Sequence, residues 1–492
     1  MARKELDQRG AVDLGDVVLH APGLRGSVNV VEGAGAAGVR GSRASRGPLA
    51  DAQRANGMST SRVIEIENPR DTRPAAAGTR GGKKPAPPSM ELTVPAPLPG
   101  QEQVVLSTDE HGVRTWHFHT SETKAAGTRG GRRMRTYDIP RTVAPVSAVS
   151  GTRGTIPGLA KIIEVITFPI AELVAGGAKF AVAKWDRDKH PHRVRIADGS
   201  TFRTLTDKDW ESLSEGPVLL FVHGTFSTTE GAFGGLPPKT MATLVDRYDG
   251  RVIAFDHPTI ADDPFENARQ FFDIVGDRDL ELDVVCHSRG GLVARAIAER
   301  PKEVDRTAES VRVNRIVFVG APNAGTILAD AKHWEELVNR FTTILSLVPG
   351  PGVTDVLESV LALVKSIAVK TATRLDGLSA MAPPSQFLKD LNGQVAPADK
   401  TTYVAIVSDY EPTNPGLKAW LNDEIRDKIF DEKPNDMMVR IDSMCGDALA
   451  TRFPIAKASR RAFAPAKGVE HSDYFPQPDT SKALLAWLNP AP

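Results

Sequence analysis

The alternation of apolar and polar residues divides the chain near residue 156. Within residues 1–155, short runs alternate between the two kinds, which is typical of β-strands with one buried face. Loops rich in Gly, Pro and Arg separate these runs, so we expect a β-rich N-terminal region with flexible loops. A hairpin is predicted around Thr-Asp-Glu-His-Gly at residues 108–112. The predicted strands are Val17–His20, Ser27–Glu32, Arg62–Glu67, Gln103–Ser107 and Val113–His119.

Residues 156–210 are predicted to form a helical connector, because Leu159–Trp185 carries apolar residues at helical spacing. This helix either packs against the domain that follows or lies on a membrane surface, which would be a peripheral membrane contact. No uncharged apolar stretch is long enough to span a bilayer, and the first residues lack the apolar run of a signal peptide.

From residue 211 to residue 492, short β-branched apolar runs alternate with amphipathic stretches. Unbroken apolar runs suit strands buried on both faces of a parallel sheet, so this part is predicted to be a doubly wound α/β domain with a mostly parallel sheet. The predicted strands are Pro217–Val222, Arg251–Phe255, Leu282–Cys286, Arg315–Val319 and Tyr403–Val407. The predicted helices are Lys239–Arg247, Glu266–Val275, Gly291–Glu299, Gly416–Phe430 and Ser481–Leu488.

The composition limits which partners and which cellular compartment we expect for the protein. The 492 residues include 61 Lys and Arg and 61 Asp and Glu, so the zero net charge gives no reason to expect a nucleic-acid partner. Residues 1–155 are mildly basic, with 22 basic against 15 acidic residues. Two cysteines, Cys286 and Cys445, argue against a disulfide framework and favour a reducing compartment. We therefore expect a cytoplasmic protein.

A short motif repeats in the basic N-terminal region. Ala-Ala-Gly-Thr-Arg-Gly-Gly occurs at Ala76–Gly82 and at Ala125–Gly131, and Gly-Thr-Arg-Gly recurs at Gly151–Gly154. Three interpretations stay open: a low-complexity linker, an anion or RNA contact, and cleavage by an arginine-specific protease. The last would cut at Arg80, Arg129 and Arg153 and would make such a protease a partner.

Candidate chemistry begins with a strand, a tight turn and a helix. The strand Leu282–Cys286 runs into His-Ser-Arg-Gly-Gly at residues 287–291, which is the setting of a nucleophile elbow with Ser288 at its apex. Such an elbow needs an oxyanion hole from two backbone N–H groups. We predict that Arg289 supplies one and that Thr225, in His-Gly-Thr-Phe-Ser after an earlier strand, supplies the other.

A serine nucleophile needs a base, and the elbow fold places its partners in the order Ser, acid, His. His333 and His471 are the only histidines after Ser288, and His333 comes too early. His471, just before the last predicted helix, is therefore the predicted base. Asp436 is the favoured acid, while Asp409 and Asp442 remain alternatives.

These motifs carry a resemblance. The segments Phe-Val-His-Gly-Thr-Phe-Ser, Cys-His-Ser-Arg-Gly-Gly-Leu-Val-Ala-Arg and Val-Gly-Ala-Pro-Asn-Ala-Gly-Thr look like the α/β-hydrolase lipases and esterases, above all a bacterial lipase-like group whose elbow reads His-Ser-Arg-Gly-Gly. The resemblance covers about residues 210–490. It implies an α/β-hydrolase fold and a Ser-His-Asp triad. One departure is Cys286, where the usual elbow has Gly.

The insertion between Val319 and Tyr403 lies where such lipases carry a cover over the serine. We predict a helical cap over about residues 327–385, with apolar helices at His333–Val348 and Thr354–Thr371. It is either a mobile cover that shapes an acyl-chain pocket, hinged at Gly350–Gly352, or an ordinary buried cap. An apolar cap favours a substrate with a fatty chain.

The resulting hypothesis is a serine hydrolase that cleaves carboxylic esters, with an acyl-ester or lipid substrate and no cofactor or metal. Its N-terminal region is expected to restrain it until proteolysis at the Arg-Gly sites releases it. An acyltransferase with the same triad is an alternative. Another is a non-catalytic interaction protein that acts through its N-terminal region.

Overall fold

The computed structural model describes most of the chain, and most of the residues outside the description lie before residue 178. The described residues are 2–32, 47–71, 89–124, 133–140, 159–171, 178–199, 201–299, 304, 310–347, 349–370, 375–393, 401–412, 417–418, 428–447, 449 and 453–489.

The N-terminal part, here called the β-module, consists of two antiparallel sheets that enclose a core of buried side chains such as Leu19, Ile64, Val105 and Tyr137. The strand orders are β1-β4-β5-β11-β7-β8 and β2-β3-β6-β10-β9. The strands are β1 (Ala2–Glu5), β2 (Ala11–Asp13), β3 (Val18–His20), β4 (Leu24–Glu32), β5 (Ser59–Asp71), β6 (Ser89–Pro95), β7 (Gln101–Asp109), β8 (Arg114–His117), β9 (Ser121–Lys124), β10 (Arg133–Pro140) and β11 (Leu159–Pro169), and a helix, α1 (Pro48–Ala55), precedes β5.

The predicted helix at Leu159–Trp185 is wrong for its first half. Residues Leu159–Pro169 form β11, which pairs with β5 and β7 in the middle of the six-stranded sheet. Ile163 and Val165 face the core of the β-module, while Ile166 and Phe168 face a second core, so both faces of the strand are apolar. An apolar run without alternation does not distinguish such a strand from a buried helix, which explains the error.

Residues 156–210 are therefore not a helical connector. After β11, the segment forms α3 (Ala178–Lys189), the strands β12 (Arg193–Asp198) and β13 (Thr201–Thr204), and most of α4 (Asp207–Leu213). The strand β11 belongs to the β-module, whereas β12 and β13 belong to the next sheet. The β-module thus reaches to Pro169.

The C-terminal part, here called the α/β domain, is built on an eight-stranded sheet of order β13-β12-β15-β14-β16-β17-β18-β19. Five pairings in this sheet are parallel, and the two that involve β12 are antiparallel. Counted over all described strands, antiparallel pairings are the majority, because every pairing in the β-module is antiparallel. The remaining strands are β14 (Val218–Val222), β15 (Val252–Asp256), β16 (Leu280–His287), β17 (Val311–Val319), β18 (Thr402–Ser408) and β19 (Arg460–Phe463).

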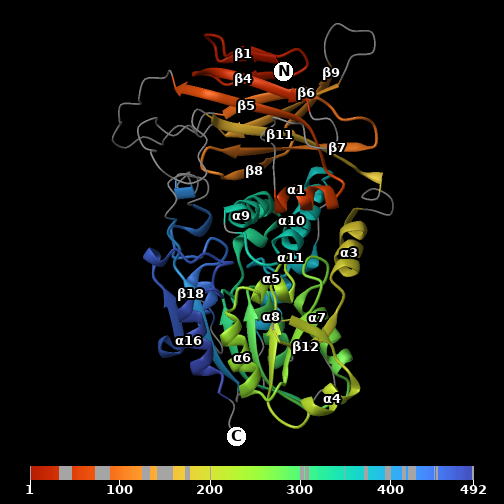
Figure 1. Ribbon diagram of the computed structural model, residues 1–492, viewed down its shortest axis with the longest axis vertical. Coiled ribbons are helices and arrows are strands. Elements are labelled where there is room, and N and C mark those ends of the chain that lie inside the picture. Colours follow the sequence, from red (N-terminus) through yellow and green to blue (C-terminus); the bar gives the residue numbers. More distant parts are fainter. Residues whose placement is uncertain are drawn as a thin grey trace.

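Helices cover both faces of this sheet (Figure 1). Along β14, Leu220 faces one hydrophobic core while Leu219 and Phe221 face another, which is why its residues form one unbroken apolar run. The covering helices are α5 (Thr229–Phe233), α6 (Pro238–Arg247), α7 (Pro264–Val275), α8 (Gly290–Glu299) and α16 (Pro478–Trp487), and a short helix, α15 (Ile441–Met444), follows the β18 region. The predicted helix Gly416–Phe430 lies mostly outside the described residues.

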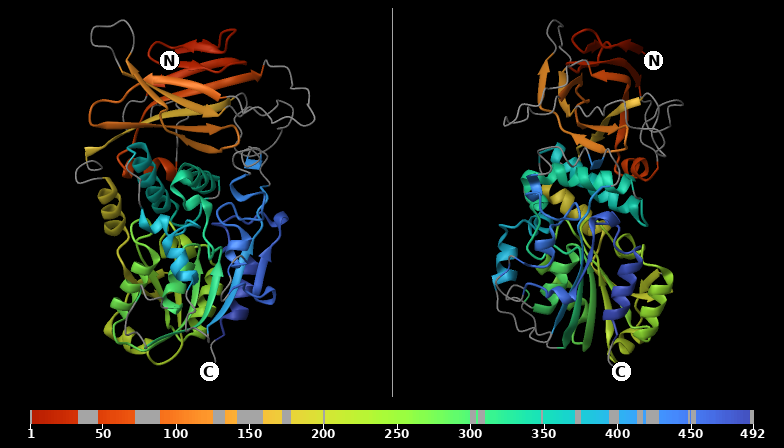
Figure 2. Two further views of the ribbon diagram at one scale, coloured as in Figure 1. Left: turned by 180° about the vertical axis from the view of Figure 1, so that it is seen from behind. Right: turned by 90° about the vertical axis from the view of Figure 1, so that its left-hand side faces the viewer.

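The cap lies between the β-module and the α/β domain, as both views in Figure 2 show. It contains α9 (Trp334–Leu347), α10 (Val353–Ala368), α11 (Asp376–Ser379) and α12 (Gln386–Gly393). No helix in the described part of the chain is long and apolar enough to cross a membrane.

The β-module contacts the cap through strand β8 and through Asn56 at the end of α1, whose side-chain amide donates to the Glu358 carbonyl in α10 at 3.4 Å. The indole N–H of Trp116 donates to Thr342 Oγ1 at 2.9 Å, and the Trp116 backbone N–H donates to Asn339 Oδ1 at 2.7 Å. The Thr343 hydroxyl donates to the Arg114 carbonyl at 2.8 Å. Trp116, Thr342 and Thr343 are buried, and one hydrophobic core runs from the β-module through the cap into the α/β domain. The cap is therefore packed on two sides.

Candidate active site

Ser288 lies at the apex of a tight turn between β16 and α8. Its φ of 51° is in the left-handed region, which a residue with a side chain adopts only under strain. A Cβ at Gly290 would lie 2.3 Å from the Val222 carbonyl oxygen, and one at Gly224 would lie 2.7 Å from Ser288 Cβ. Both positions therefore require glycine. Cys286, where the resemblance expected glycine, is accommodated as a buried side chain in the core.

Three of the predicted site residues meet in one hydrogen-bonded chain. His471 Nε2 lies 2.9 Å from Ser288 Oγ, and His471 Nδ1 lies 2.7 Å from Asp436 Oδ2. All three side chains are buried, and Asp436 has no exposed surface. With Nδ1–H donated to the carboxylate, the Nε2 lone pair faces the serine hydroxyl, which is the arrangement of an activated nucleophile.

Of the three acids that the sequence left open, Asp436 is the one against His471. Its other oxygen, Oδ1, accepts the backbone N–H groups of Met438 at 3.1 Å and Val439 at 2.8 Å. Asp442 instead pairs with Arg440 and Lys433. The backbone of Asp409 bonds to Phe463 at the end of β19, and burial raises the pKa of its carboxyl.

The two predicted oxyanion donors flank the serine. A Cβ at Gly224 would lie against Ser288, Thr225 follows Gly224 in the chain, and Arg289 follows Ser288. Among the backbone hydrogen bonds of the described turns and loops, neither N–H donates to a carbonyl. Both are thus available to a developing oxyanion.

The side chain of Arg289 has a role that the sequence did not indicate. Its guanidinium is fully buried and donates to the carbonyl of Gly377 in the cap at 3.1 Å, to Asn267 Oδ1 at 2.8 Å and to the carbonyl of Asp262. Burial lowers the pKa of this guanidinium to about 10. The residue after the nucleophile therefore ties the elbow to α7 and to the cap.

Two titratable residues next to the triad were also missed. The ring of His287 contacts that of His471, and its Nε2–H donates to the His471 carbonyl at 2.9 Å. Burial lowers the pKa of His287 to about 3, so its ring is neutral. Burial raises the pKa of Glu470 to about 7, and its carboxyl accepts from the backbone and hydroxyl of Ser472. The sequence offered one signal for these two residues, which is that each directly precedes a predicted triad residue, Ser288 or His471.

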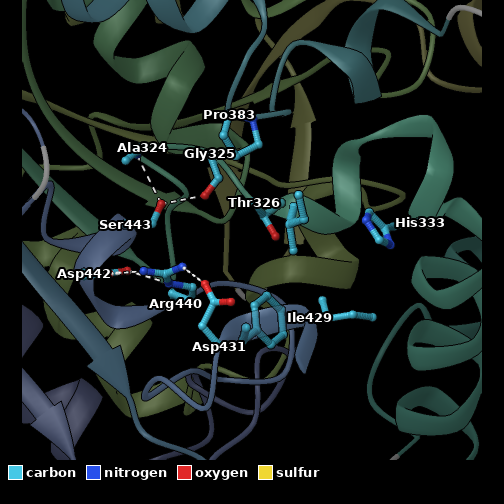
Figure 3. Close-up of a pocket in the computed structure, with 12 residues that line it drawn as sticks. Ala324, Gly325, Thr326, His333, Pro383, Ile429, Asp431, Arg440, Asp442 and Ser443 are labelled. Carbon is cyan, nitrogen blue, oxygen red and sulfur yellow. Dashed lines mark hydrogen bonds and ion pairs between the residues drawn. The ribbon is translucent and has the colours of Figure 1, made fainter. Parts of the chain in front are cut away.

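A cavity of about 530 Å³ is lined by residues that include Arg440 and Asp442 in the acid loop, and none of the triad lines it. Thr326 connects the cavity to the loop that carries Asp436, because its hydroxyl donates to the Met438 carbonyl at 2.6 Å. Figure 3 shows Arg440 bonded to Asp442 and Asp431 on one wall. The lining residues are Ala324, Gly325, Thr326, Ile327, His333, Pro383, Ile429, Phe430, Asp431, Arg440, Asp442 and Ser443.

Among the described residues, no group of three or more His, Cys, Asp or Glu side chains is placed to hold a metal ion. Arg80, Arg129 and Arg153 lie outside the described residues.

Comparison with known proteins identifies the family. A model described as a domain of unknown function, DUF7379, matches residues 189–489, and the chain belongs to this family. No curated protein matches the sequence.

Several solved structures are similar to part of the chain, each covering 56% of it. A lipase from Bacillus licheniformis, BlEst2 in its mature form, is 18% identical, with 92% of that chain covered and a TM-score of 0.33. Lipase 1 from Pelosinus fermentans is 12% identical, with 99% covered and a TM-score of 0.38. A putative aryl esterase from Burkholderia cenocepacia is 12% identical, with 90% covered and a TM-score of 0.30. These values are too low to bear on activity or substrate.

Proposed function

We propose that the chain is a serine hydrolase of the α/β-hydrolase type that cleaves carboxylic esters. The observation that carries the proposal is the buried chain of hydrogen bonds from Asp436 through His471 to Ser288. Three side chains brought together from positions 436, 471 and 288, with the order of bonds that nucleophilic catalysis needs, are difficult to explain as packing alone.

The reaction follows from the geometry. Ser288 Oγ attacks the acyl carbonyl while its proton passes to His471 Nε2, and Asp436 stabilises the imidazolium that results. The N–H groups of Thr225 and Arg289 hold the oxyanion. When the tetrahedral intermediate collapses, the alcohol leaves with the proton from His471. Water then attacks the acyl-enzyme through the same base, which releases the acid and restores Ser288.

The substrate class proposed is a lipid-like ester. Its support is the apolar cap next to the oxyanion loop. Phe341 in α9 packs edge to face on Phe226, the residue after Thr225, with ring centroids 5.0 Å apart. Val356 in α10 lies 3.4 Å from where a Cβ of Gly231 would be, so α10 covers the helix that follows the loop. These apolar side chains lie beside the predicted oxyanion loop, which supports a substrate with a fatty acyl chain.

Proteolytic control at Arg80, Arg129 and Arg153 is part of the proposal. Its support is the sequence repeat together with the hydrogen bonds from Trp116 in the β-module to α9 in the cap. Loss of these bonds would free α9, which lies beside the oxyanion loop.

The experiment has two readouts, so that an unknown substrate does not obscure the answer. A fluorophosphonate probe, from which a serine alkoxide displaces fluoride, should label the full chain but not Ser288→Ala. Hydrolysis of p-nitrophenyl esters with short to long acyl chains should disappear in the same variant. Ser443→Ala, in the wall of the separate cavity, is the control and should retain both.

The labelling results test the nucleophile, and the fate of the acyl group separates a hydrolase from an acyltransferase. Labelling that persists in Ser288→Ala would refute the proposed nucleophile. Labelling that is lost, with transfer of the acyl group to an added alcohol in preference to water, would assign an acyltransferase instead.

A further inference from the structure

Tyr474 is a buried residue beside the triad that the proposed mechanism does not use. Its hydroxyl lies 2.9 Å from Asp436 Oδ2, the same oxygen that accepts Nδ1–H of His471 at 2.7 Å. Tyr474 and Asp436 both have no exposed surface. The phenol therefore approaches the carboxylate in a space without bulk water, where a hydrogen bond to a charged group is strong.

The phenol can only be the donor in this bond. Burial, followed by the negative charges of Asp436 and Glu470, holds the pKa of Tyr474 well above its ordinary value, so the proton stays on the phenol. With the N–H groups of Met438 and Val439 on Oδ1, the carboxylate accepts four hydrogen bonds in all. One of these four competes directly with His471 for the charge on Oδ2.

The surroundings hold the Tyr474 ring in this place. Gly320, at the end of β17, has a φ of 59° and lies against the meeting point of the three side chains. A Cβ there would lie 3.0 Å from Tyr474 Cε2, 3.2 Å from Asp436 Oδ2 and 3.3 Å from His471 Cε1. Phe463 also packs on the ring of Tyr474, with centroids 6.1 Å apart. The absence of a side chain at position 320 is thus what allows Tyr474, Asp436 and His471 to converge.

We infer that Tyr474 is a positioning residue that sets both the orientation and the charge of the triad acid. Its hydroxyl prevents Asp436 from rotating away from His471, and it takes up part of the negative charge on Oδ2, so that the carboxylate holds a proton on the imidazole less strongly. The inference rests on the proposed function, because it assigns Tyr474 a role in the same triad.

The other groups that face His471 do not offer the same control. Ser288 lies on the opposite side of the ring, at Nε2. His287 is neutral through burial and bonds to the backbone of His471 rather than to its ring. The carboxyl of Glu470 is turned to Ser472. Tyr474 is thus the polar neighbour that acts on His471 through Asp436.

Tyr474→Phe tests the inference, because it removes one oxygen and keeps the ring that fills the site. Activity toward a p-nitrophenyl ester should show kcat reduced roughly tenfold, with KM within about twofold, because Asp436 loses the contact that holds it in place against His471 and this loss of orientation outweighs its stronger attraction for the imidazolium. The low-pH limb of kcat/KM should move to higher pH by about half a unit to one unit, because the carboxylate without this donor favours the protonated imidazole.

Tyr248→Phe is a matched control. Tyr248 is also a buried tyrosine whose hydroxyl donates to a buried carboxylate, at 2.6 Å from Asp283 Oδ2, but this pair lies near the start of β16, away from Ser288. A comparable loss of stability with unchanged kcat and an unchanged pH profile is expected. If Tyr474→Phe behaves like Tyr248→Phe, the role is merely structural and the inference is refuted.

A second measurement keeps the inference separate from the proposed function. In the full chain labelled with ¹⁵N-histidine, the signals of His471 are assigned from their loss in His471→Gln and followed through a pH titration. Their midpoint should move upward in Tyr474→Phe even if no ester is hydrolysed. An unchanged midpoint overturns the inference whatever the activity. If instead the fluorophosphonate probe does not label the full chain at Ser288, the proposed function is overturned.

Discussion

The contact between the β-module and the cap predicts that a residue far from Ser288 in the sequence governs the cap. Trp116 is 2% exposed, and its indole N–H is bonded to Thr342 Oγ1 in α9. The variant Trp116→Phe removes this bond and part of a packed ring. The lost hydrogen bond contributes about 1 kcal/mol and the lost packing about 1–2 kcal/mol, so we expect unfolding to become easier by about 2–3 kcal/mol.

A double-mutant cycle with Thr342→Val isolates the bond itself. The backbone N–H of Trp116 still donates to Asn339 in every variant, so the strand stays in register with α9. Urea unfolding, followed by far-UV circular dichroism, should give a coupling energy of about 1 kcal/mol between the two side chains. Ester hydrolysis should rise in Trp116→Phe, because the weakened contact partly frees α9, the helix that packs Phe341 on Phe226 and whose release is proposed to activate the enzyme.

Additive effects of the two substitutions would refute this reasoning. So would an unchanged unfolding midpoint in Trp116→Phe, because a side chain that stabilises the cap cannot be shortened without cost. Loss of stability with unchanged activity would show that the cap can loosen without disturbing the oxyanion loop.

The other predictions concern the packing around the triad, the pH dependence of stability, and cleavage at the N-terminal arginines. Gly320→Ala should reduce kcat by roughly a hundredfold or more, because its methyl group would press on Tyr474, Asp436 and His471. The control Gly350→Ala, in the turn between α9 and α10 with open space around it, should be active, and equal activities would contradict the assigned crowding. The raised pKa of Glu470, about 7 when folded against 4.5 ordinarily, means that the unfolded chain releases this proton first, so stability falls as pH rises from about 4.5 to 7. Glu470→Gln should remove up to about 3 kcal/mol of that decline, measured by urea unfolding at pH 4.5 and pH 7, and a parallel pH dependence in both proteins would contradict the assignment. Cleavage at Arg80, Arg129 and Arg153 with the fragments left in place should raise ester hydrolysis, with Arg→Gln at all three sites as the control, and equal rates before and after cleavage would exclude proteolytic control. A chain that starts at Ile156 should instead be unstable, because β11 would lose both of its neighbours, β5 and β7.

The sequence by itself was sufficient for features that depend on neighbouring residues. The strand and helix around Ser288 follow from an apolar run that ends in His-Ser-Arg-Gly-Gly, and the close contacts at Gly290 and Gly224 explain why small residues stand there. Most of the strands of the α/β domain were recognisable for the same reason, since a strand buried on both faces is apolar along its length.

The same local rule failed for β11. Both of its faces are buried, by two different cores, and the pattern of its residues does not state what covers them. The sequence favoured Asp436 but left Asp409 and Asp442 open, because the choice depends on which loop carries a carboxylate to His471 across 29 to 62 positions of sequence.

Only the tertiary structure decided what surrounds the triad and what holds the cap. Tyr474 follows His471 by three residues, yet its bond to Asp436 exists because the residue after β17, Gly320, has no side chain and leaves room for it. Trp116 meets Thr342 from 226 positions away, and no periodicity in either segment indicates the other. Local patterns report which faces of an element are buried, whereas the partner of each face is chosen by packing of the whole chain, where long-range contacts are made together.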